Sequence, residues 1–177
     1  MPQRFETVVE NSRWVHNGVH FLSLHIVGSN NFEARPGAPQ EFFARDAANQ
    51  AWLEAGFARA GQEDAPGIVV AFQADMWEDR APREPLQNGQ TTTLATVRRP
   101  AAAFGQPVLL VHGASHVPRI DQPLRDNAGR RIDSVTRLMV MGAQEVHAVR
   151  VTVDPAELGL FAFTPLRVPE NATRSRM

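Results

Sequence analysis

Short apolar runs of strand length alternate along the chain with longer stretches of helical period. Two runs, 67–72 and 108–111, are apolar without alternation, which is typical of strands buried on both faces of a sheet. In the segment 19–27, apolar and polar residues alternate instead. Asn17-Gly18 before it supplies the positive φ angles of a tight turn back to Trp14-Val15. The pattern therefore predicts a hairpin followed by two buried strands.

Two helices are predicted between these strands. From Ala47 to about Ala60 the apolar side chains fall on one face, with Asp46 in the position of an N-cap and a glycine after the last turn. A second helix is expected from Thr91 onward. Because proline lacks a backbone N–H, Pro100 predicts a kink there or a division into two pieces.

The last third of the chain has the pattern of a β meander. After a polar loop at 125–133, short strands are expected at 136–141, 146–153 and 160–164, all paired antiparallel. The complete order is hairpin, helix, strand, helix, strand and meander. It predicts an α/β layered sandwich with a mixed sheet, and 177 residues predict a single domain over 1–177.

Composition excludes several classes of partner. The chain has 18 arginines and no lysine against 19 acidic residues, for a net charge of -1, and the arginines are scattered, so no nucleic-acid surface is predicted. Without cysteine there is no disulfide or thiolate metal site. No apolar stretch reaches the roughly 20 residues of a membrane span, and the first residues lack the apolar core of a signal peptide. A cytoplasmic protein without membrane contact is therefore expected from the chain as written.

Candidate chemistry concentrates where the two buried strands end. If each strand follows a right-handed crossover, their carboxyl ends lie side by side and form one site. Imidazole, carboxylate and amide groups in such a site suit Mn, Fe or Zn better than Ca. The residues that supply these groups are His112, His116, Asp75, Asn30 and Asn31. A histidine at a strand end also serves often as a hydrogen-bonded structural residue, and that alternative stays open.

An arginine follows the second strand end at position 119. Its guanidinium can bind a phosphate through two parallel hydrogen bonds, and it can equally pair with the neighbouring Asp121. The sequence leaves both alternatives open.

Four segments in order, 14–25, 46–57, 67–75 and 107–116, resemble the second half of the calcineurin-like metallophosphoesterases. The resemblance spans nearly the whole chain and implies the fold of that half, a phosphoester substrate and bound divalent metal. It places a metal ligand at His116, the second histidine of a Gly-His-x-His motif, with Ala114 at the first. Gln73 stands where the family has a strand-end histidine, and His112 is a further candidate ligand. The expected substrate-binding residues are Arg119, Asn30, Asn31 and Asp75.

The family's Asp-x-His, Gly-Asp and Gly-Asn-His motifs are not found before Trp14. In the family they supply most of both metal spheres and the catalytic histidine, so weak or no hydrolysis is expected from this chain alone. The alternative is a non-catalytic remnant or binding subunit whose exposed sheet edge pairs with a complementary chain or with a second copy. A third possibility is an upstream segment that belongs to the working protein and that would also bear on its location.

Overall fold

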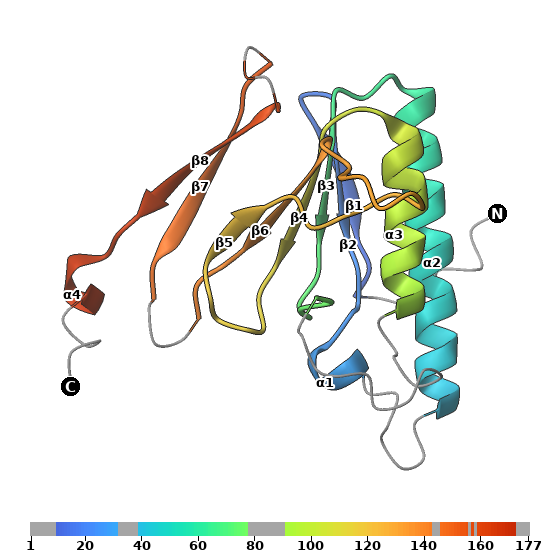
Figure 1. The fold of residues 1–177 in the computed structure, drawn as a ribbon, viewed down its shortest axis with the longest axis horizontal. Coiled ribbons are helices and arrows are strands. Elements are labelled where there is room, and N and C mark those ends of the chain that lie inside the picture. The colour runs from blue at the N-terminus through green and yellow to red at the C-terminus, as the bar shows by residue number, and fades with distance from the viewer. Residues whose placement is uncertain are drawn as a thin grey trace.

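A mixed sheet with the strand order β1-β2-β3-β4-β6-β5 forms the middle of the fold in the computed structural model (Figure 1). The structure describes residues 10–31, 39–77, 91–142, 146–155, 157 and 159–172. The strands are β1 (Arg13–His16), β2 (Val19–Ser23), β3 (Ile68–Ala71), β4 (Val108–His112), β5 (Arg119–Asp121) and β6 (Val135–Met139). Strands β2, β3, β4 and β6 run parallel, and β1 and β5 are antiparallel edges. The predicted α/β class with a mixed sheet is confirmed.

Helices α2 (Pro39–Gln62) and α3 (Thr91–Phe104) cover one face of this sheet (Figure 1). Apolar side chains from both helices and from the facing side of the strands form the main core. Gly56 lets α2 approach β2 closely, because a Cβ at this position would lie 2.6 Å from a methyl carbon of Leu22. The shorter helices are α1 (Gly28–Asn31) and α4 (Pro169–Ala172). None of the helices within the described ranges is long and apolar enough to cross a membrane.

A separate hairpin lies on the opposite side of the sheet (Figure 1). Its strands, β7 (Ala148–Val153) and β8 (Phe161–Leu166), pair antiparallel. A second core forms where Leu160 and Phe161 meet Val69, Leu109 and Leu138 of the sheet. The central strands are therefore covered on both faces, which explains why β3 is apolar throughout and β4 is apolar up to its last residue, His112.

The predicted start of the first long helix is wrong. Asp46 lies inside α2 rather than at its N-cap. Its carboxylate accepts a hydrogen bond from the Thr93 hydroxyl of α3 and another, at 2.6 Å, from the side-chain amide of Gln50. The Asp46 side chain therefore joins α2 to α3 instead of capping α2. This contact depends on the tertiary structure and cannot be read from the local sequence.

Of the two alternatives expected at Pro100, a kink or a division, the division into two pieces is wrong. Helix α3 continues through this position to Phe104. Val97 and Ala101, on either side of the proline, are fully buried against the sheet. Packing of this face outweighs the roughly 3 kcal/mol that an internal proline costs a helix.

The predicted meander is wrong in its pairing. Strand β6 lies parallel to β4, and the short strand β5, which was not predicted, pairs antiparallel with β6. Only β7 and β8 pair with each other as expected. The short apolar runs between turns indicate that these segments are strands. Which strands pair with each other depends on packing between distant segments.

Candidate functional site

The carboxyl ends of β3 and β4 lie side by side, as the sequence predicted. The Gly113 N–H donates to the Gln73 carbonyl at 3.3 Å, and the Phe72 N–H donates to the Val111 carbonyl at 3.0 Å. The Phe72 and His112 rings stack with their centroids 5.3 Å apart. Parallel pairing of the two strands thus brings the segments after Phe72 and after Val111 into one place.

His112 is buried where the two strands end. It is only 2% exposed, and its ring packs against both Phe72 and Trp77, whose rings also contact each other with centroids 6.5 Å apart. Its Nδ1 lies 3.1 Å from the Gly113 carbonyl oxygen, so Nδ1 carries the proton and donates. Among the described residues, its Nε2 has no hydrogen-bond partner. The ring therefore presents a bare nitrogen lone pair, the arrangement found in metal-bound histidines whose other nitrogen is fixed by a carbonyl.

The same surroundings keep this imidazole neutral. Burial is the largest cause that lowers the pKa of His112 below its ordinary value, and Arg137 acts in the same direction. The hydrogen bond to Gly113 and the negative charge of Asp75 oppose the shift without reversing it. A neutral imidazole is the form that binds a metal ion or accepts a hydrogen bond.

Asp75 links the two strand ends. Its Oδ2 accepts a hydrogen bond from the Ser115 hydroxyl at 2.5 Å, and its Oδ1 accepts one from the Trp77 N–H at 3.0 Å. The carboxylate is buried. It therefore fixes the turn after β4 to the turn after β3.

Arg137 of β6 belongs to this cluster and was missed from the sequence. It is 2% exposed, and its Nε and Nη2 donate to the two Asp121 oxygens at 2.7 and 2.5 Å. Its guanidinium carbon lies 4.9 Å from the centre of the Trp77 ring, and its Nη1 lies 3.9 Å from Asp75 Oδ1. An arginine inside the apolar strand Val135–Met139 was the available signal, since a buried charge is costly without a partner.

Arg119 lies at the same level of the sheet as His112. Both residues are register partners of Met139, Arg119 from β5 and His112 from β4. Partners in adjacent strands share a face of the sheet, and strands are spaced by about 4.8 Å, so the two Cα atoms are separated by about 10 Å. Arg119 is exposed and has no partner within the described part of the chain.

The other predicted residues take different positions. Gln73 is exposed, and its Oε1 accepts a hydrogen bond from the Gly28 N–H at 2.5 Å, which joins the ends of β2 and β3. His116 is exposed in the turn after β4, and its ring packs against Gly142 so closely that a Cβ there would overlap it.

Asn31 is fully buried against Arg45, which donates to its side-chain oxygen at 2.5 Å and to its carbonyl at 2.9 Å. These contacts tie α1 to α2. The side chain of Asn30 lies outside what the structure describes.

The strand ends thus gather Gln73, Asp75 and His112, with His116 and Arg119 in the segment that follows. Among the described residues, no group of three or more His, Cys, Asp or Glu side chains could hold a metal ion. The donors at the strand ends are one buried imidazole, one exposed imidazole, an amide oxygen, and the Asp75 carboxylate, both of whose oxygens already accept hydrogen bonds.

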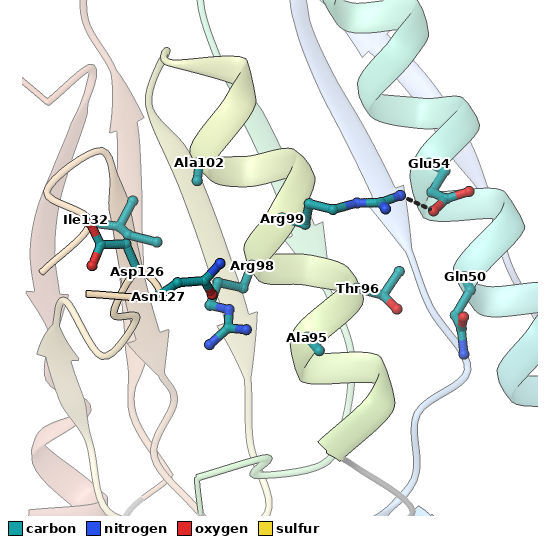
Figure 2. Close-up of a pocket in the computed structure, with 10 residues that line it drawn as sticks. All are labelled: Gln50, Glu54, Ala95, Thr96, Arg98, Arg99, Ala102, Asp126, Asn127 and Ile132. Atoms are coloured by element: carbon teal, nitrogen blue, oxygen red, sulfur yellow. Dashed lines mark hydrogen bonds and ion pairs between the residues drawn. The ribbon is translucent and has the colours of Figure 1, made fainter. Parts of the chain in front are cut away.

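A hollow of about 490 Å³ lies elsewhere on the surface, along α3 between α2 and the loop after β5 (Figure 2). Arg99 reaches from α3 to Glu54 of α2, with 2.8 Å between nitrogen and oxygen, and Arg98 lies on the other side near Asn127. None of the residues predicted from the sequence lines this hollow. The candidate chemistry is at the strand ends instead.

Comparisons with protein-family models, with curated proteins and with solved structures found no match. The resemblance to metallophosphoesterases therefore stays a prediction from the sequence.

Proposed function

We propose that the carboxyl ends of β3 and β4 form part of a metal-dependent phosphoester hydrolase site. The observation that carries this proposal is the Nε2 of His112, a buried nitrogen lone pair without a partner among the described residues. A buried polar atom is normally hydrogen-bonded, so one that is not calls for an explanation such as an ion. His112 would hold a divalent ion such as Mn²⁺, Fe²⁺ or Zn²⁺, with His116 and Gln73 as neutral donors from neighbouring turns.

A bound ion would polarise the phosphoryl group and lower the pKa of a water molecule. The chain's own residues support this in separate ways. The Gly113 carbonyl orients the imidazole of His112, and Asp75 holds the two turns together through Ser115. Arg119 carries a positive charge at the rim, on the face of the sheet that holds His112. An arginine at this position attracts an anionic group such as the phosphate of a phosphoester substrate.

The direct test is hydrolysis of p-nitrophenyl phosphate and its diester by the metal-loaded chain. We expect slow hydrolysis that depends on added Mn²⁺ and is lost in His112→Gln. His116→Gln, at an exposed position, should lower the rate as well. The matched control is His16→Gln, an exposed histidine of β1 that should keep the wild-type rate. Absence of Mn²⁺-dependent hydrolysis, or equal rates in wild type and His112→Gln, would overturn the catalytic proposal.

The second candidate is a non-catalytic binding subunit that pairs through the edge strand β1. The observation in its favour is that Trp14 and Val15 on this outermost strand are 52% and 41% exposed. An edge strand with exposed apolar side chains is a template for another strand. Light scattering on wild type and Val15→Lys tests it. Loss of a dimer or complex in the variant would support pairing through β1, and a stable wild-type monomer that binds no partner strand would count against it.

A further inference from the structure

The turn after β4 has an unusual backbone. Ala114 and His116 both have positive φ angles, 74° and 61°, whereas Ser115 between them does not. Neither residue is a glycine, so each stores a small amount of strain. The Ser115 N–H bonded to the Gly113 carbonyl closes a γ-turn centred on Ala114. The next two residues have a negative and then a positive φ, the order in which successive N–H groups can point to one side and form a concavity for an anion.

The N–H groups of this turn are available. The Ser115 N–H donates to the Gly113 carbonyl at 3.2 Å, but those of His116 and Val117 donate to no acceptor in the described part of the chain. The Ser115 hydroxyl is held by Asp75 at 2.5 Å, which fixes the turn in place. The two free N–H groups are therefore preorganised at the mouth of the strand ends.

Within the described ranges, the positive charge next to this turn comes from Arg119. Arg137 is nearby but is occupied, since Asp121 takes two of its donors at 2.5 and 2.7 Å. Arg119 lies two residues before Asp121 and therefore on the same face of β5. It is exposed and without a partner among the described residues. Asp121 thus neutralises the buried arginine and leaves Arg119 as the cation at the rim.

We propose that the turn Gly113–Val117 and Arg119 form a subsite for a tetrahedral oxyanion, which in a phosphoester substrate is the phosphoryl group. The N–H groups of His116 and Val117 donate to one side of the anion and the guanidinium of Arg119 to another. The identity of the anion as substrate rests on the proposed function, but binding of the anion itself requires no metal. The subsite also gives the strained backbone at Ala114 and His116 a function, because these φ angles direct the amide N–H groups toward the anion.

The test is a titration of metal-free protein with inorganic phosphate, followed by the amide nitrogen and proton shifts of the backbone. The expected result is saturable movement of the His116 and Val117 resonances with a dissociation constant on the order of millimolar. Arg119→Ala should weaken phosphate binding by about tenfold or more, since hydrogen bonds between two charged groups are roughly twice as strong as neutral ones. Arg150→Ala, an exposed arginine of β7, is the matched control and should bind as wild type.

Three results would overturn the proposal. They are absence of saturation in wild type, equal affinity in Arg119→Ala and wild type, and saturation without movement of the His116 and Val117 amides. Because the titration contains no metal, its failure is separate from that of the hydrolase proposal. If the protein binds phosphate but not Mn²⁺, the anion subsite is supported and the metal site is ruled out.

Discussion

At the scale of a single residue, His112 is polar at a buried position where an apolar side chain would be more stable. A leucine or phenylalanine would pack against Phe72 and Trp77 without leaving a polar atom unpaired. The imidazole instead has one nitrogen fixed by the Gly113 carbonyl and the other without a partner among the described residues. Such a side chain has consequences for stability that can be measured before any ligand is known.

The first prediction concerns pH. Because burial lowers the pKa of His112 in the folded state, the unfolded chain binds its proton at the ordinary value of 6.5 while the folded chain does not. The contribution of this residue to stability is therefore complete above pH 6.5 and decreases as the pH falls through the lowered folded pKa. In His112→Phe, which keeps the aromatic stack, this component should vanish, so the free energy of unfolding falls less between neutral and acidic pH.

Urea unfolding of metal-free wild type and His112→Phe at several pH values measures this difference. The expected result is a steeper loss of stability in wild type below pH 6.5. Parallel curves for the two proteins would show that His112 is not held neutral by its surroundings.

The second prediction concerns the strained turn. Ala114 has a φ of 74°, which glycine adopts at no steric cost. Glycine also adds entropy to the unfolded chain, and the two effects leave a net stabilisation of about 0.5 kcal/mol in Ala114→Gly. The control is Ala95→Gly in the exposed part of α3, which should destabilise the protein by about 0.5 to 1 kcal/mol. Thermal unfolding in which both variants lose stability would contradict the left-handed conformation of Ala114.

At the scale of elements, the sequence predicted the kinds of structure better than their connections. The two buried strands, the turn at Asn17-Gly18 and the helical faces follow from local periodicity, and these were confirmed. The position of Asp46, the continuity of α3 through Pro100 and the partner of β6 depend on contacts between distant segments. Local pattern carries no information about such contacts, which is why these three expectations were wrong.

The contact between α2 and α3 gives the third prediction. Thr93 is buried, and its hydroxyl donates to the buried carboxylate of Asp46. Thr93→Val keeps the shape but removes the donor, so we expect a loss of about 1 to 3 kcal/mol in the free energy of unfolding. Thr152→Val on the exposed surface of β7 is the matched control and should change stability by less than about 0.5 kcal/mol. Equal effects of the two substitutions in urea unfolding would show that the Asp46 contact does not stabilise the helix pair.

At the scale of the whole molecule, three layers place the candidate site at one end of the sheet. Helices cover one face and the β7–β8 hairpin the other, so the strand ends are where polar side chains can gather (Figure 1). The sequence predicted that the ends of β3 and β4 meet, because both strands are buried and parallel. It did not predict Arg137 or Asp121 there, because their contribution depends on β6 lying beside β4 and on the short strand β5.

The central claim is that the bare nitrogen of His112 is a ligand. Calorimetric titration of metal-stripped protein with Mn²⁺ tests it most directly, with His112→Phe as the comparison because that variant retains the ring stack. The account predicts binding with a dissociation constant on the order of micromolar in wild type and none in the variant. Absence of Mn²⁺ binding to wild type, or equal binding to both proteins, would contradict it.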